Sequence, residues 1–241
     1  MKKLFPLAAV LLLLTGCQKF EDLEQNPNVP AAVPANLVLR GILVDLYEGS
    51  WNKDQRWNQY YTINYNYYGN NEYDWTATSF KYTTLKNVGK MEEEAKKQTG
   101  KDLNPYSALG KFFRAYYFVW MTQRVGDLPL TEALKGTENI TPKYNTQKEV
   151  YVQALKWLDE ANADLTTLIA AGDNTIQGDI YLSNDLRKWQ KVVNTFKLRV
   201  LMSLSKRADD ADLAVKTRFA EVVNNPAKFP LMASPADNLQ Y

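Results

Sequence analysis

The stretch that decides the fold is NPYSALGKFFRAYYFVWMTQRVG, residues 104–126, and its pattern predicts one long amphipathic helix. Asn104 can cap this helix, and Pro105 suits its first turn because a proline has no amide hydrogen to leave unpaired there. Large apolar side chains then recur at helical spacing and form a wide face, made of Leu109, Phe112, Phe113, Tyr116, Tyr117 and Trp120. We expect this face to form core and the helix to end before Gly126.

Further helical patterns lie on both sides of this stretch. They cover residues 35–48, 80–98, 146–172, 185–206 and 211–223. The clearest start is at Thr146, because Glu149 follows at the spacing of a capping box. No alternating run is long enough to require a large sheet. The sequence therefore predicts a mainly α fold of stacked helical hairpins, similar to tetratricopeptide repeats but without a clean repeat period.

The amino-terminal residues, MKKLFPLAAVLLLLTGC, carry a targeting signal. Lys2 and Lys3 form a basic start, and the apolar run at residues 4–14 is shorter than the roughly 20 residues that a bilayer span needs. Residues 14–17, LTGC, resemble a bacterial lipobox, in which the cysteine is acylated after the leader is removed. We therefore expect lipidation at Cys17 and a membrane anchor made of lipid.

The resulting organisation has three parts. Residues 1–16 are expected to be a lipoprotein signal peptide, residues 17–34 a flexible proline-containing tether, and residues 35–241 a folded helical domain. Gln18 stands where an inner-membrane retention signal would place aspartate, which favours the cell outer membrane by resemblance to known sorting rules. The acidic residues that follow loosely resemble a surface-export signal, so we expect the protein to face the exterior.

Composition excludes several kinds of chemistry. The chain has no histidine and a single cysteine, so Ser-His-Asp and Cys-His catalysis, an intrachain disulfide and a cysteine zinc site are all excluded. The formal net charge is +2 with no basic stripe, which argues against a nucleic-acid partner. We expect no cofactor, no metal site and no catalytic residue.

Residues 108–134, ALGKFFRAYYFVWMTQRVGDLPLTEAL, resemble the SusD/RagB family of surface lipoproteins of Bacteroidetes, which bind glycans or peptides. The resemblance rests on Phe113-Arg114-Ala115, then Gly126-Asp127-Leu128-Pro129, then Glu132-Ala133-Leu134. It implies a structural role for Phe113, Arg114, Gly126, Asp127 and Pro129. From the residues themselves, we expect Arg114 to satisfy carbonyls or pair with an acid, and Asp127 to cap its turn.

The resemblance also implies partners. Members of the family pass an oligosaccharide or peptide to a TonB-dependent outer-membrane transporter (SusC-like). Members are about twice as long as this chain, and their second half contributes to the ligand site. The resemblance therefore implies that this chain is an amino-terminal half, truncated at its carboxyl end. The last segment, residues 226–241, carries no helical pattern. Within it, Pro230-Leu231-Met232 followed by Asp237-Asn238 resembles the family's crossing strand.

An aromatic and amide-rich stretch, WNQYYTINYNYYGNNEYDW at residues 57–75, holds the candidate ligand site. Sugar C–H faces stack on aromatic rings, and amides fix the hydroxyls. In the family this region forms part of a sugar-binding arc, so the resemblance points to Trp75, with Tyr73 second. Asn70, Asn71 and Asp74 are the candidate polar partners. Most rings of the stretch could equally pack against the helices, since asparagine-rich turns need no ligand.

Three other functions stay open. The chain could bind peptide rather than glycan, because both suit a groove of rings and amides. It could be a structural or adhesive lipoprotein. It could also be a glycosidase that uses two carboxylates such as Glu72 and Asp74, although acids two residues apart in an extended loop face opposite ways.

Overall fold

The computed structural model describes residues 32–50, 52–63 and 79–240, and Pro34–Tyr241 form one compact unit. The helices are α3 (Ala35–Val44), α4 (Lys53–Trp57), α5 (Tyr82–Thr99), α6 (Pro105–Val125), α7 (Gln147–Ala170), α8 (Leu186–Ser203) and α9 (Val215–Asn224). Short 3-10 turns occur at Gly136–Glu138, Ser205–Arg207 and Pro235–Asp237. The described residues contain no strand, only an isolated bridge between Leu128 and Asn145. The prediction of a mainly α fold is confirmed.

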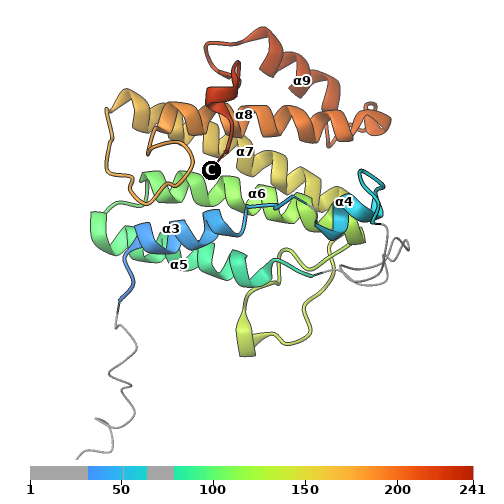
Figure 1. Cartoon of the computed structure of the whole chain (residues 1–241), viewed down its shortest axis with the longest axis horizontal. Coiled ribbons are helices and arrows are strands. Elements are labelled where there is room, and N and C mark those ends of the chain that lie inside the picture. Colours follow the sequence, from blue (N-terminus) through green and yellow to red (C-terminus); the bar gives the residue numbers. More distant parts are fainter. Residues whose placement is uncertain (1–31, 51, 64–78, 241) are drawn as a thin grey trace, which may run out of the picture. The chain divides into compact units, whose positions relative to one another are not determined.

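Consecutive helices pack as antiparallel neighbours. Helix α5 packs on α6, α6 on α7 and α7 on α8, while α3 lies on α5 (Figure 1). Helix α6 therefore contacts partners on two sides, which explains why most of its residues are buried. Leu109 and Phe113 of this helix are fully enclosed, as the wide apolar face predicted. The fold is thus a layer of stacked helical hairpins built around α6.

The helix ends follow the local signals in the sequence. Asn104 accepts a hydrogen bond from the Ser107 amide at 3.0 Å, and the Ser107 hydroxyl accepts one from the Asn104 amide at 3.1 Å. The predicted capping box at Thr146 and Glu149 is confirmed. Gly100 ends α5 with a φ of 68°, a left-handed conformation that glycine adopts without strain. These ends fix where each hairpin turns.

The end of α3 differs from the prediction. The pattern of residues 35–48 extends the helix to Glu48, but α3 stops at Val44. The carbonyl of Ile42 accepts a hydrogen bond from the Tyr117 hydroxyl at 3.0 Å, and the carbonyl of Leu43 accepts one from the Tyr181 hydroxyl at 3.1 Å. The Leu43 carbonyl also accepts the Leu46 amide at 3.1 Å, and the Tyr117 hydroxyl gives the Ile42 carbonyl a partner, which lets the chain leave the helix early. The missed helix α4 is too short to give a periodic pattern.

The prediction that the whole aromatic face of α6 is core is partly wrong. Phe112, Phe113 and Tyr117 are buried, but Tyr116 and Trp120 are only half-buried. They lie on the side of α6 that neither α5 nor α7 covers, where the helix borders an open groove. The prediction of a crossing strand near the carboxyl end is also wrong, since residues 230–233 carry no regular secondary structure and a 3-10 turn follows at Pro235–Asp237. Among the described helices, none has the length and apolarity needed to cross a bilayer.

Candidate functional site

The residues predicted for lipid and ligand lie outside the part of the chain that the structure describes. These are Cys17, Asn70, Asn71, Tyr73, Asp74 and Trp75, together with Glu72 of the glycosidase alternative. The structure describes residues 57–63, the beginning of the aromatic stretch. This part includes both buried and exposed rings. Trp57 of α4 is buried, whereas Tyr60 is 83% exposed. The stretch is therefore neither wholly core nor wholly surface at this end.

Arg114 reaches from α6 to α5. Its guanidinium forms a two-pronged pair with the carboxylate of Glu92, and one N–H···O distance is 2.5 Å. Gly110, one turn earlier on α6, makes room for this pair, because a Cβ at Gly110 would lie 2.1 Å from Glu92 Oε1. Of the two predicted partners, carbonyls or an acid, the structure shows the acid. This pair joins two neighbouring helices.

The turn after α6 connects to the start of α7. Gly126 has a φ of 77°, and the Thr122 hydroxyl donates to its carbonyl at 2.6 Å. The expectation that Asp127 caps its own turn is wrong: its carboxylate accepts a hydrogen bond from the Gln147 amide at 2.8 Å, at the first residue of α7. The Pro129 carbonyl accepts the Tyr82 hydroxyl at 2.7 Å, and the pKa of Tyr82 is raised to about 12, chiefly by burial. The motif thus ties α5, α6 and α7 together.

A large open groove lies between α3, α6 and α8. Its volume is about 1430 Å³, larger than the roughly 300–1,000 Å³ of most small-molecule sites. The walls come from α3 and the residues after it, from α6, from α8, from Ile180 and Tyr181, and from the carboxyl-terminal segment. The lining residues include Arg40, Val44, Tyr47, Glu48, Tyr116, Trp120, Arg124, Thr195, Phe196, Arg199, Met232, Asn238, Leu239 and Gln240.

Aromatic rings of α6 and α8 form the floor of the groove. Phe112 and Tyr116 contact Phe196 with ring centroids 5.8 Å and 5.3 Å apart. Tyr116 also meets Tyr117 edge-on at 5.3 Å. Burial is the main cause of the raised pKa of Tyr116; Glu48 nearby also raises it, while Arg199 and Arg124 lower it. The floor is a packed aromatic layer whose polar edge meets charged side chains.

Trp120 lies at one end of the groove among charged groups. The guanidinium carbon of Arg124 lies 3.5 Å from its ring centroid, and the ammonium of Lys81 lies 5.5 Å from it. The indole N–H donates to Glu48 Oε1 at 3.0 Å. Arg124 in turn pairs with Asp54 at 2.6 Å. Trp120 is therefore held in place by two cations and one carboxylate.

The groove is positively charged. Its lining holds Arg40, Arg124 and Arg199 but only one acidic residue, Glu48. Arg124 is neutralised by Asp54, whereas Arg40 and Arg199 form no ion pair within residues 32–50, 52–63 and 79–240. Both are exposed. The surface thus combines apolar rings with two uncompensated cations.

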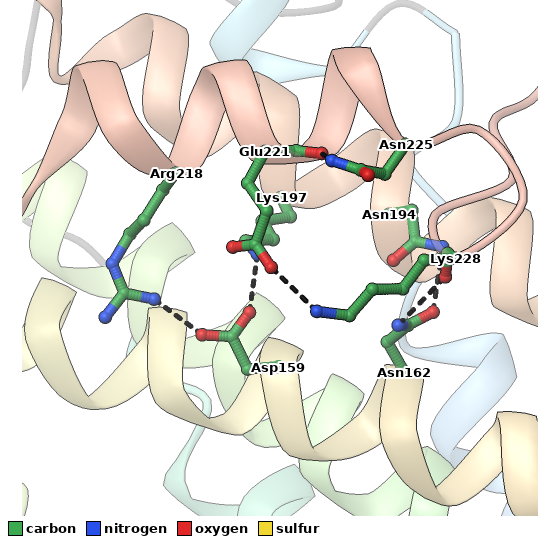
Figure 2. Close-up of polar contacts among 8 residues, drawn as sticks. All are labelled: Asp159, Asn162, Asn194, Lys197, Arg218, Glu221, Asn225 and Lys228. Carbon is green, nitrogen blue, oxygen red and sulfur yellow. Dashed lines mark hydrogen bonds and ion pairs between the residues drawn. The ribbon is translucent and has the colours of Figure 1, made fainter.

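A polar network lies on the other side of α8, between α7 and α9 (Figure 2). The ammonium of Lys197, whose side chain is 1% exposed, lies 2.5 Å from Asp159 Oδ1 and 4.8 Å from the Phe229 ring centroid. Arg218 of α9 bonds the other oxygen of Asp159 at 2.5 Å. Lys228 contacts the Phe229 ring at 4.8 Å and pairs with Glu221 at 2.7 Å. The network fastens α9 and the turn after it to the hairpin of α7 and α8.

The same side of the hairpin holds the backbone of the carboxyl-terminal segment. Asn162 donates to the Lys228 carbonyl at 3.2 Å, and Asn194 donates to the Pro230 carbonyl at 3.1 Å. The Met232 amide then donates to Thr195 at 3.0 Å. From there the segment reaches the groove, where Met232 and residues 238–240 form part of the wall. Side chains of α7 and α8 therefore guide this segment into the groove.

The lining of the groove combines aromatic rings, amides and arginines. No cluster of three or more residues suited to holding a metal ion occurs in the part of the chain described here. Sequence reasoning assigned Tyr116 and Trp120 to the core and did not single out Arg40 or Arg199. The sequence feature that could have indicated the partial exposure of Tyr116 and Trp120 is the width of the apolar face on α6. Two neighbouring helices cannot cover a face of this width.

Residues 27–241 match the model of a SusD-like family described as "Starch-binding associating with outer membrane". No curated protein matches the chain. Among solved structures, a SusD homologue from Bacteroides fragilis NCTC 9343 shares 35% identity with a TM-score of 0.70, and the match covers 87% of this chain and 44% of that one. A second SusD homologue from the same strain shares 34% identity with a TM-score of 0.71, over 86% of this chain and 43% of that one.

A protein from Bacteroides vulgatus ATCC 8482, whose description connects it with the outer membrane and with nutrient binding, shares 33% identity with a TM-score of 0.71. The match covers 86% of this chain and 44% of that chain. This chain therefore spans less than half the length of each of these three structures.

Proposed function

Because this chain belongs to the SusD-like family, the SusD/RagB group that its sequence resembles, we propose that it binds glycan at the outer membrane and delivers it to a TonB-dependent transporter. The observation that carries this proposal is the family match over residues 27–241, since that family is described as starch-binding and associated with the outer membrane. The protein acts by binding, not by catalysis.

Three features of the sequence support the cellular placement. The lipobox at residues 14–17 supports anchoring through lipid on Cys17, and the polar tether at residues 17–34 would hold the folded part away from the bilayer. Gln18 after the cysteine favours the outer membrane. In this proposal the helical domain faces the exterior and meets its ligand there.

The proposed ligand contacts are Trp75 and Tyr73, with Asn70, Asn71 and Asp74 as polar partners. An aromatic ring stacks on the apolar face of a sugar, while amide and carboxylate groups hydrogen-bond to its hydroxyls. Such a site binds one face of a glycan and does not cleave its glycosidic bonds.

The test is retention of starch-type polysaccharide by the purified protein, followed by analysis of the products. We expect retention without cleavage, and Trp75→Ala should weaken it about 5- to 150-fold, the equivalent of roughly 1–3 kcal/mol for one stacking ring by analogy with base stacking. Tyr144→Ala is the matched control, because Tyr144 is an exposed ring on a different loop. Cleavage would indicate a glycosidase, retention of peptides alone a peptide-binding relative, and no retention a structural lipoprotein.

Anchoring is tested separately. Cys17→Ser should leave the protein without lipid and release it from membranes. Recovery of this variant in the outer-membrane fraction with an intact lipid mass shift would contradict the proposal.

A further inference from the structure

A loop with exposed apolar side chains connects α6 to α7. Leu134 is 50% exposed, Ile140 is 82% exposed and Tyr144 is 71% exposed. Figure 1 shows this α6–α7 loop, residues 130–145, extending beyond α5 and away from α8. When several apolar side chains are exposed on one segment, they commonly mark a surface that meets protein or lipid.

Polar side chains of the loop hold its backbone in this shape. Glu132 Oε2 accepts hydrogen bonds from the Asn139 side-chain amide at 3.0 Å and from the Lys143 backbone amide at 3.0 Å. Asn145 Oδ1 accepts one from the Thr131 amide, also at 3.0 Å. These bonds join the two halves of the loop. The apolar side chains are therefore presented by a hydrogen-bonded backbone.

Leu134 has an unfavourable backbone conformation in addition. Its φ is 66°, a left-handed value that a bulky residue rarely adopts. Its side chain is half exposed, so burial within this chain does not offset the cost. Backbone strain of this kind is often kept where a segment has a function.

The attachment point of the tether indicates which surface the loop meets. The tether, residues 17–34, joins α3 at Ala35, and α3 packs on α5. These two helices form the edge of the helical layer beyond which the loop extends (Figure 1). A tether of this length spans at most about 60 Å when fully extended. Lipid on Cys17 would therefore keep the bilayer within reach of the edge that carries the loop.

The side chains of the loop fit a lipid interface. Single apolar side chains on a protruding loop need a soft surface that closes around each of them, which the headgroup region of a bilayer provides. Tyrosine is enriched in that region, and lysines beside it extend their ammonium groups toward lipid phosphates. Lys135 and Lys143 are exposed on the loop, and the acids Glu132 and Glu138 balance their charge. The apolar side chains, and not net charge, would therefore supply the attraction.

We propose that the α6–α7 loop inserts Leu134, Ile140 and Tyr144 into the headgroup region of the outer membrane. The folded part then rests on the lipid surface in a fixed orientation, with the tether and the loop on the same edge. This proposal rests on the membrane placement proposed above and does not depend on glycan binding at Trp75.

The experiment places a fluorophore on the loop. The mature chain, residues 17–241 with Cys17→Ser, carries an amino-terminal histidine tag that binds a nickel-chelating lipid in place of the acyl chains. Because Cys17 is the only cysteine and the chain has no histidine, Thr141→Cys gives a single labelling site beside Ile140. The vesicles contain phosphatidylethanolamine and phosphatidylglycerol. We expect an environment-sensitive label at this site to shift to shorter wavelength on the vesicles, at low and at high salt.

Matched variants make the test specific. Ile140→Asp should weaken insertion roughly tenfold, because it removes one apolar contact and adds a charge. Met202→Asp is the control, since Met202 is 65% exposed on α8, away from the loop. A label at Met202→Cys should show no shift. Both substituted side chains are exposed, so thermal melts should show that the variants are folded.

Four outcomes would overturn the proposal: the label at Thr141→Cys does not shift, a label at Met202→Cys shifts equally, Ile140→Asp leaves the shift unchanged, or high salt abolishes it. The tag replaces the lipid on Cys17, so failure of lipidation would not alter these results. Tyr144→Ala should weaken insertion but keep glycan retention, whereas Trp75→Ala should do the reverse. The two proposals therefore fail separately.

Discussion

Polar groups are buried and hydrogen-bonded on one side of α8 but exposed on the other. On the side toward α7 and α9, Lys197 and Asn194 are fully buried and bonded to neighbouring side chains and carbonyls. On the side toward the groove, Arg199 is exposed without an ion pair in the described residues, and Thr195 holds only the Met232 amide. One helix thus separates a closed interior from an open surface.

The difference shows on which side of α8 the polar groups find their hydrogen-bond partners within this chain. The network around Asp159 is nearly satisfied by residues of this chain; the exceptions there are Asn194 Oδ1 and Arg218 Nε, which have no hydrogen-bond partner within the described residues. Buried polar groups normally have hydrogen-bond partners, and on the side toward α7 and α9 few such groups still lack one. The groove pairs its rings with one another but leaves apolar and charged groups at its rim. The side chains of this chain therefore close one side of α8 and leave the other open.

The largest predicted effect lies in the core that supports both sides. Phe113 is fully buried and contacts Phe112 and Trp189 with ring centroids 5.5 Å and 5.9 Å apart. Phe113→Ala should lower the free energy of unfolding by about 3–5 kcal/mol, because it leaves a cavity that close-packed neighbours cannot fill. Urea denaturation measures this. A loss below about 1 kcal/mol would mean that the face of α6 is not the core.

The second prediction concerns the polar network on the side of α8 that faces α7 and α9. Asp159→Ala leaves the buried ammonium of Lys197 without its carboxylate, and we expect a loss of about 3 kcal/mol, since an unpaired buried charge is costly. Lys197→Met is the control. It leaves Asp159, which is partly exposed and still paired with Arg218, so it should cost about 1 kcal/mol or less. Equal losses in the two variants would show that burial of the ammonium is not the dominant cost.

The third prediction addresses the open side. Trp120→Ala should cost about 2 kcal/mol, roughly half of a fully buried ring, because the indole is half-buried and its contact with Arg124 adds a modest cation–π energy. Thermal unfolding of this variant beside Phe113→Ala measures the ratio of the two effects. A loss of stability as large as that of Phe113→Ala would mean that Trp120 belongs to the core and not to the wall of the groove.

The helices could be predicted from the sequence because their signals are local. Asn104 with Pro105 and Thr146 with Glu149 set the starts of α6 and α7, and Gly100 ends α5, all within a few residues of the boundary. The end of α3 could not be predicted, because it depends on the Tyr117 hydroxyl, 75 positions away along the chain. Boundaries that rest on distant partners leave no pattern nearby.

The groove shows the same limit more strongly. Its arginines come from α3, α6 and α8, and only the packing of these helices brings them together. The width of the aromatic face on α6 predicted burial but not which part of the face lacks a neighbour. For the ligand site at Trp75, the sequence supplied residue types suited to sugar, and that assignment stays a prediction because the residue lies outside the described part.

The smallest predicted effect is a stabilising contribution that is lost in acid. It concerns the carboxyl-terminal segment, which runs from one side of α8 to the other. Asp237 accepts hydrogen bonds from the Ala233 amide at 3.0 Å and from the Lys191 ammonium at 2.9 Å. These two bonds, the first above all, lower its pKa from 3.8 to about 2. A carboxyl whose pKa is lower in the folded state stabilises the fold above its ordinary pKa, and this contribution is lost as the pH falls from about 4 to about 2.

Asp237→Asn tests this contribution because asparagine keeps the shape but not the charge. The unfolding free energies of the original protein and the variant should differ near neutral pH, and the difference should shrink as the pH falls through that window. Other carboxylates titrate in the same range, but they are common to both proteins and cancel in the comparison. A difference that stays constant down to about pH 2 would mean that the charge of Asp237 does not hold the carboxyl-terminal segment against α8. The edge of the groove would then depend on the backbone bonds to Asn162, Asn194 and Thr195.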